Sequence, residues 1–149
     1  MPYDLFLTFS INDMKPLMKS ALASLGLLLI AGIAQGALVL GAARPAIYGQ
    51  KTIVKTELHN TFTNAIESAR AVMFLLDDNG KVVGQETRWI VGGTKDRPAL
   101  RPDEKTTFSF VLQSQKPFTK TKLTVTRIIL EGGKLADVNK DVQMESAPK

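Results

Sequence analysis

Residues 71–91, AVMFLLDDNGKVVGQETRWIV, constrain the fold of this chain more than any other stretch. They contain two apolar runs rich in strand-forming side chains, separated by Asp78-Asn79-Gly80. Asn-Gly between such runs predicts a β-hairpin, because both residues accept the positive φ that a type I′ turn requires. Side chains on both faces of residues 71–76 are apolar, so we expect this strand to lie inside the fold with cover on both sides.

Further strands are expected around the hairpin. Strand-like patterns, most of them with apolar and polar residues alternating, occur in four more stretches: 52–60, 106–112, 122–131 and, more weakly, 134–144. Residues 94–102 contain two prolines that a central strand does not tolerate, so they are expected to form a loop. No helical period follows residue 44. The sequence therefore predicts an all-β domain over residues 51–144, an antiparallel sandwich of six or seven strands, with a flexible tail at 145–149.

The composition excludes several classes of site. The chain has 149 residues, enough for one domain plus an appendage. It has no cysteine, so disulfides, thiolate metal sites and a lipid anchor on an N-terminal cysteine are impossible. The net charge is +5, but lysine and arginine are scattered among acidic residues without a dense run. This pattern is typical of a solvated surface, and we expect no nucleic-acid partner.

The N-terminal part of the chain predicts export. Residues 21–43 carry no charge and follow the basic segment 14–19, and translation could begin at Met1, Met14 or Met18. The positive-inside rule keeps the basic flank in the cytoplasm and sends the domain outward. We therefore expect an extracytoplasmic protein, either periplasmic, secreted or anchored to the outer face of the cytoplasmic membrane.

Three interpretations of residues 21–43 are open. In the first, they are an apolar helix that acts as a signal peptide, with small residues Ala34 and Gly36 before a mature start near Ala37. In the second, the helix is a retained anchor, because the run continues through residues 38–40 and about 20 apolar residues suffice to span a bilayer. A buried core helix is the third. We favour cleavage, with residues 1–43 as the targeting segment, in transient or retained contact with the membrane, and residues 44–50 as a linker.

Three short motifs occur in the order found in one known family. A strand ends in Asn at 54–60, Met73-Phe74-Leu75-Leu76-Asp77 precedes Asn79-Gly80, and Leu100-Arg101-Pro102-Asp103-Glu104 precedes Phe108. This layout resembles the FxLYD-type domains of exported prokaryotic proteins, which belong to the immunoglobulin-like superfamily. The departures are Met73, Leu76 and Asp103, where the family has Phe, Tyr and Gly. The resemblance implies an immunoglobulin-like, extracytoplasmic, non-enzymatic module, and it carries over no catalytic residues.

Candidate catalytic groups are few. His59 is the only histidine, so neither a histidine-based triad nor a multi-histidine metal site can be built. Its place in a half-buried strand predicts a solvent-facing side chain. Asp77 and Asp78 are adjacent carboxylates that would point to opposite faces of a strand, and aspartate before Asn-Gly is typical of a turn. We therefore expect no enzymatic activity and no cofactor.

One stretch has the spacing of a calcium loop. Asp137, Asn139 and Asp141 form a D-x-N-x-D pattern that places three oxygen ligands as such loops do. However, Val142 stands where the loop needs glycine, and Pro148 stands where it needs a bidentate carboxylate. We therefore predict that this stretch does not bind calcium usefully.

Three residues are candidates for contact with a ligand or partner. Trp89 could stack on a sugar or contact a partner if exposed, although a lone tryptophan in a sandwich is more often part of the core. Arg97 and Arg101 lie in the proline-bounded loop and could hold a carboxylate or phosphate. A solvated loop is the alternative for both arginines.

These features together predict a non-enzymatic binding or structural module of the cell envelope, engaging an envelope protein or polymer through its sheet edges and end loops. Two alternatives remain. One is a membrane-anchored domain that binds calcium or an anion. The other is an envelope hydrolase, which has the least support because no residue can be nominated as its nucleophile or base.

Overall fold

The computed structural model describes residues 36–114 and 116–145, which contain nine strands and one 3-10 turn. The elements are β1 (Leu38–Leu40), β2 (Arg44–Tyr48), β3 (Lys51–Asn60), β4 (Ile66–Leu76), β5 (Val82–Val91), β6 (Lys105–Gln113), β7 (Lys120–Leu130), η3 (Glu131–Gly133), β8 (Lys134–Leu135) and β9 (Val142–Met144). None of the helical turns in this part of the chain is long and apolar enough to cross a membrane.

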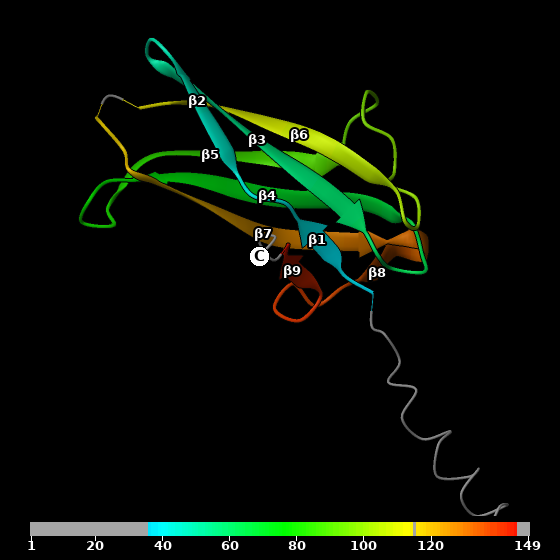
Figure 1. Cartoon of the computed structure of the whole chain (residues 1–149). Helices are drawn as coiled ribbons and strands as arrows, with labels where there is room; N and C mark the ends of the chain where they lie inside the picture. The colour runs from blue at the N-terminus through cyan, green and yellow to red at the C-terminus, as the bar shows by residue number, and fades with distance from the viewer. Residues whose placement is uncertain (1–35, 115, 146–149) are drawn as a thin grey trace, which may run out of the picture. The chain divides into compact units, whose positions relative to one another are not determined.

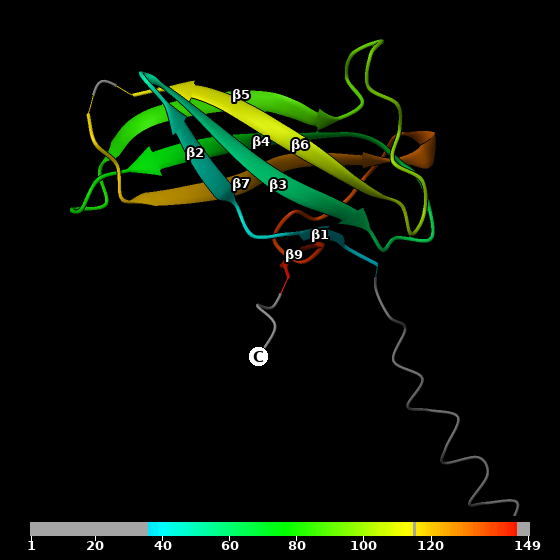
Figure 2. The same cartoon turned by 45° about the horizontal axis from the view of Figure 1, so that its top comes forward.

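The strands form two sheets that pack face to face (Figures 1 and 2). Sheet A has the order β2-β3-β1-β9, with β6 on the other side of β3, and sheet B has the order β5-β4-β7-β8. All pairs are antiparallel except β1 with β9. The prediction of an all-β fold with two layers of mainly antiparallel strands is confirmed.

The core lies between the two sheets and follows the alternation in the sequence. In β3, Val54, Thr56 and Leu58 point inward, and in β6 Phe108, Phe110 and Leu112 do the same. The phenylalanine rings meet edge to face at 4.8 Å between centroids. Apolar burial of this kind stabilises by about 25 cal/mol per Å² removed from water. The described residues belong to one compact unit with this core, so this unit can fold on its own.

The central hairpin forms, but its turn differs from the prediction. Asp77 and Lys81 close the loop, because the Asp77 N–H donates to the Lys81 carbonyl oxygen at 2.9 Å. Among its residues only Gly80 has a positive φ, at 77°. The expected two-residue type I′ turn is therefore wrong, and three residues form the loop instead. The cause is the Asp77 carboxylate, which accepts the N–H groups of Asn79 and Lys81 and favours this geometry.

The first arm of the hairpin is central within its sheet but has cover on one side only. β4 lies between β5 and β7, and Ala71, Met73 and Leu75 are fully buried against sheet A. Val72 and Phe74 point to the outer face of sheet B and are half-buried. The expectation of cover on both sides is thus wrong, because an apolar stripe on an antiparallel sheet can be shielded within the sheet itself.

The sandwich begins earlier in the sequence than expected. Residues 38–40 form β1, which pairs with both β3 and β9, and Leu38 and Leu40 are buried in the core. Residues 44–48, predicted to be linker, form β2 and pair with β3. Pro45 is compatible with this because β2 is an edge strand along its length. Residues 1–35, which include most of the predicted targeting segment, lie outside the described residues.

The last predicted strand is split in two. Between β8 and β9 the chain turns through residues 136–141, which contain the D-x-N-x-D stretch. The turn carries the chain from the edge of sheet B to the edge of sheet A, where β9 joins β1 in parallel. A single strand over 134–144 is therefore wrong. Of the predicted tail, residues 146–149 lie outside the described residues.

Candidate functional site

Arg97 is held within its own loop. Its guanidinium carbon lies 4.6 Å from the centroid of the Phe108 ring, and Nη1 donates a hydrogen bond to the carbonyl oxygen of Trp89. These contacts fix the loop after β5 against β6. The side chain lines a hollow of about 220 Å³ together with Asp96 and Glu104, which place negative charge beside it.

Arg101 does not join Arg97 in that hollow. Its side chain is exposed, whereas its backbone N–H donates to the Glu104 carboxylate at 2.8 Å. The hollow beside Arg97 has no contribution from Arg101. The two arginines that the sequence places in one loop are therefore not brought together as an anion clamp.

The exposure of Trp89 is intermediate between the two alternatives that the sequence left open, a core side chain and an exposed one. It is half-buried on the outer face of sheet B, opposite Arg70 of β4 in the register. The Arg70 guanidinium carbon lies 5.8 Å from the indole centroid. A Cβ at Gly93 would come within 2.5 Å of the indole, so the glycine turn after β5 closes tightly over the ring. The indole is thus covered on two sides, by an arginine and by backbone.

The D-x-N-x-D stretch uses its carboxylates within its own turn. The Asp137 carboxylate accepts the Asn139 N–H at 3.0 Å, and the Asp141 carboxylate accepts the Asp137 N–H at 2.8 Å. Lys140 Nζ lies 3.6 Å from Asp137 Oδ2. No group of three or more acidic, histidine or cysteine side chains in the described part of the chain is placed to hold a metal ion. That calcium does not bind stays a prediction.

The outer face of sheet A carries polar and charged side chains that pair with one another. His59 Nε2 lies 2.8 Å from Asp103 Oδ1, and Lys105 Nζ lies 3.6 Å from Glu57 Oε1. His59 is 25% exposed, so it is less solvent-facing than predicted. Exposed pairs of this kind contribute about 0–1 kcal/mol each to stability.

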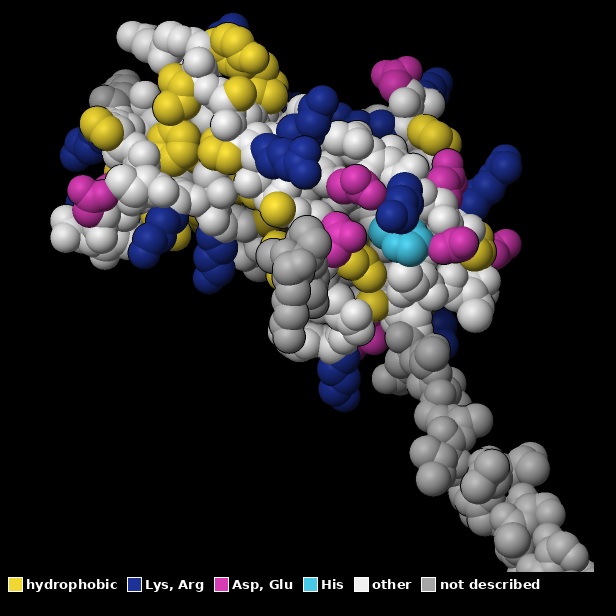
Figure 3. Space-filling view, in the orientation of Figure 1, with side chains coloured by type: hydrophobic (Ala, Val, Ile, Leu, Met, Phe, Trp, Pro, Cys, Tyr) yellow, Lys and Arg dark blue, Asp and Glu magenta, His cyan; other side chains and the backbone are white. Residues whose placement is uncertain are grey.

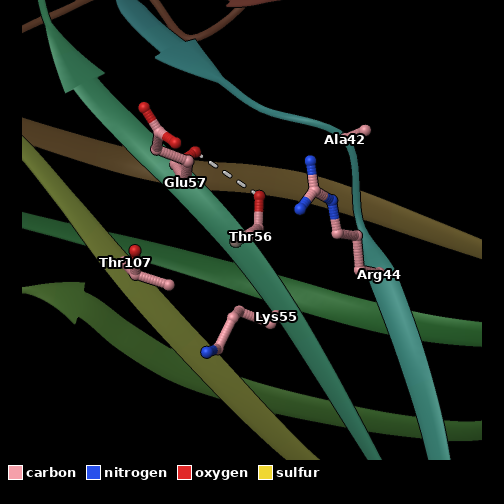
Figure 4. A pocket seen from close by; sticks show the side chains of 6 residues that line it. All are labelled: Ala42, Arg44, Lys55, Thr56, Glu57 and Thr107. Atoms are coloured by element: carbon pink, nitrogen blue, oxygen red, sulfur yellow. Dashed lines mark hydrogen bonds between the residues drawn. The ribbon is translucent and has the colours of Figure 1, made fainter.

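A polar hollow of about 110 Å³ lies on this sheet where the chain passes from β1 to β2 (Figure 4). Arg44, Lys55 and Glu57 surround it. The Thr56 hydroxyl donates to the Gly41 carbonyl oxygen at 3.0 Å, and the side chain is buried. That hydroxyl is therefore committed to the backbone. The hollow brings together no nucleophile and base within hydrogen-bond reach.

Asn60, the last residue of β3, organises one end of the sandwich. Its buried side-chain amide donates to the carbonyl oxygens of Leu100, Arg101 and Asn64 at 2.9, 3.1 and 3.1 Å, and its Oδ1 accepts the Phe62 N–H. We call this region, with Thr61 and Asp103, the Asn60 end. The sequence shows an asparagine at a strand end but not its role, because two of its partners, Leu100 and Arg101, lie about 40 residues away.

The opposite end is exposed, apolar and basic. In Figures 1 and 2 the β2–β3 turn, the β4–β5 turn and the β6–β7 connection lie together at this end. Figure 3 shows hydrophobic side chains gathered there, with lysine and arginine around them. We call this region the lysine end, and we define it by these residues of the three connections: Ile47, Tyr48, Lys51, Lys81, Val82, Lys116, Pro117, Phe118 and Lys120.

Together, these features define a β-sandwich domain over residues 36–114 and 116–145. No protein family and no curated protein matches the sequence. A solved protein described as ApaA from Bordetella pertussis has a similar fold, with TM-score 0.51 and 15% identity over 68% of this chain and 86% of that one. IrmA from Escherichia coli gives TM-score 0.48 and 11% identity over 77% and 96% of the two chains. At 15% identity the likeness to the Bordetella protein concerns the fold alone.

Proposed function

We propose that this chain is an exported, non-enzymatic module of the cell envelope that binds an envelope component. The observation that carries the proposal is the point at which the sandwich begins. Ala37, Leu38 and Leu40 are each at most 1% exposed, so they belong to the core. The apolar residues left for a membrane are then 21–36. This stretch is shorter than the roughly 20 residues of a spanning helix and fits a signal peptide.

The contacts of Ala37 support a mature chain that starts close to it. The Ala37 N–H donates to the Thr61 hydroxyl at 2.8 Å, and that hydroxyl donates to the Ala37 carbonyl oxygen at 3.0 Å. Gly36 is small for a packing reason as well, because a Cβ there would lie 2.3 Å from the Phe62 Cα. The small size of Gly36 is thus explained by packing. Of the two small residues, Ala34 is therefore the better support for cleavage of a signal peptide.

A binding role without catalysis is supported by how the polar groups are used. His59 pairs with Asp103, the Asp77 carboxylate caps a turn, and Thr56 donates to the backbone. Two of the candidate groups that the sequence offered, His59 and Asp77, are thus engaged in structure. General acid–base catalysis would need such groups to converge on an open cleft.

Membership of the FxLYD-type, immunoglobulin-like group is also a proposal, and two details support it. Asp103 stands where that group has glycine, and its φ of 60° is the single positive value among the described non-glycine residues. Left-handed backbone is the conformation for which glycine is selected. Asn60 joins the first and third motifs through its contacts with Leu100 and Arg101.

The test is the mass and location of the protein in its native cell. Fractionation followed by intact-mass measurement should find, outside the cytoplasm, a chain that starts within residues 35–37. A full-length chain in the cytoplasm would contradict export. A chain that keeps residues 18–36 and fractionates with membranes would establish an anchored domain instead of a processed one.

A further inference from the structure

The lysine end carries apolar side chains that are exposed to solvent instead of buried in the core. Ile47 and Tyr48, beside the β2–β3 turn, are 66% and 65% exposed, and Val82, beside the β4–β5 turn, is 45% exposed. Pro117 is exposed and Phe118 half-buried in the β6–β7 connection. Three separate loops thus present apolar side chains at one end. Contiguous exposure of this kind marks an interaction site more often than single exposed residues do.

Lysines surround these apolar side chains. Lys51, Lys81, Lys116 and Lys120 are exposed, and none forms an ion pair with any described residue. The carboxylates nearby are Asp77, which accepts backbone N–H groups, and Asp78 in the same turn. Lys116 lies beside two open grooves, of about 280 and 480 Å³, that also reach Ile47 and Val82. The net charge of this end is therefore positive.

We propose that the lysine end docks on the surface of an anionic phospholipid bilayer. Lysine is depleted in protein–protein interfaces, whereas lysine beside aliphatic and aromatic side chains is enriched where proteins rest on anionic membranes. In this arrangement Ile47, Tyr48 and Val82 enter the headgroup region and the lysines contact lipid phosphates. Each lysine near an anionic leaflet contributes about a five-fold factor in affinity.

The lysine end lies away from the point where the chain enters the sandwich. β3 runs from Lys51 at the lysine end to Asn60 at the other, and the first described residue, Gly36, packs beside Phe62 next to Asn60. Ten residues of strand span about 33 Å, so the docking end lies that far from where the chain enters the sandwich. The proposal rests on the envelope location proposed above, and it names the partner as lipid.

The test uses residues 37–149, which include the whole core of the compact unit at residues 35–149, and measures co-sedimentation with vesicles. Vesicles of phosphatidylglycerol and phosphatidylcholine should bind the protein, and vesicles of phosphatidylcholine alone should not. The double variant Lys51→Gln/Lys116→Gln should bind about 25-fold more weakly, the product of two five-fold factors. Its matched control is Lys95→Gln/Lys134→Gln, which removes two exposed lysines outside the lysine end and should bind as the parent does.

A second pair of variants tests whether apolar side chains enter the bilayer, in addition to the attraction between lysines and lipid phosphates. Ile47→Ser should weaken binding, whereas Leu135→Ser, at a side chain of 63% exposure away from the lysine end, should not. The proposal would be overturned if the protein bound neutral vesicles as strongly as anionic ones. It would also be overturned if a lysine-end variant and its matched control lost binding equally. So would a dimer in solution that Ile47→Ser dissolves, because the end would then be an interface between copies. These results do not depend on where the cell places the protein, so failure here leaves the export proposal standing.

Discussion

The two ends of this sandwich use their polar groups in opposite ways. At the Asn60 end, a buried amide and a hydroxyl bind backbone groups of loops that are distant in sequence, and His59 pairs with Asp103. At the lysine end, four lysines have no charged partner among the described residues, and apolar side chains are exposed. The first end is therefore expected to contribute to folding stability, and in our proposal the second end is the one that contacts a partner. Substitutions at the two ends should therefore affect different measurements.

The largest effect is expected at Asn60. Replacing it with Ala removes the donor to Leu100 and Arg101 and leaves the Phe62 N–H without its acceptor. Buried groups without partners cost about 1–3 kcal/mol each, so the free energy of unfolding should fall by about 3 kcal/mol. Urea denaturation measures this. Asn64→Ala is the control, because only the backbone carbonyl of Asn64 accepts from Asn60, and a similar loss in both variants would refute the role of the Asn60 side chain.

The next effect concerns the backbone at Asp103. With φ at 60°, valine at this position would be strained, and Asp103→Val should cost about 2 kcal/mol of stability. Asp103→Asn removes the negative charge beside His59 but tolerates the left-handed conformation, so it should change stability by less than about 0.5 kcal/mol. Thermal unfolding of the two variants compares the stability cost of backbone strain with the cost of losing the carboxylate charge. If the asparagine variant is the less stable one, the carboxylate of Asp103 matters more than the backbone conformation.

A smaller effect is expected at Thr61. Thr61→Val keeps the shape of the side chain but loses both hydrogen bonds to Ala37. Because this site is partly exposed, the loss should be about 1 kcal/mol, measured by urea denaturation. Thr63→Val is the matched control, since the Thr63 hydroxyl contacts only its neighbour Asn64. No difference between the two would mean that β1 is held by its strand pairing alone.

The smallest effect on stability is expected at the lysine end. Lys51→Gln/Lys116→Gln should change the free energy of unfolding by less than about 0.5 kcal/mol, because neither lysine has an ion-pair partner among the described residues. Differential scanning calorimetry at low salt is the most sensitive check. A clear loss of stability would show that these lysines support the fold, and the contrast between the two ends would then fail.

The strands were predictable where local pattern decides them. Alternation in 52–60 and 106–112 placed Val54 and Phe110 in the core, and both are fully buried. β1 and β2 were missed because residues 38–43 belong to an apolar run that favours a membrane interpretation, and residues 44–48 follow that run directly. Only pairing with β3 shows that Leu38 and Leu40 belong to the sandwich.

The candidate sites were less predictable because they depend on distant contacts. Arg97 and Arg101 are close in sequence, but only Arg97 lines the hollow beside Phe108. The lysines of the lysine end are scattered in sequence, so charge patterning indicated an ordinary solvated surface. The three connections bring them to one end of the molecule. Asn60 had a visible signal, an asparagine at a strand end, but its partners could not be read from spacing.

Hydrogen–deuterium exchange of residues 37–149, with and without phosphatidylglycerol vesicles, tests the division between the two ends most directly. The structure predicts that vesicles slow exchange at 47–51, 80–83 and 116–120, and leave exchange at 60–62 and 100–104 unchanged. Protection confined to the Asn60 end, or the same exchange everywhere with and without vesicles, would contradict it.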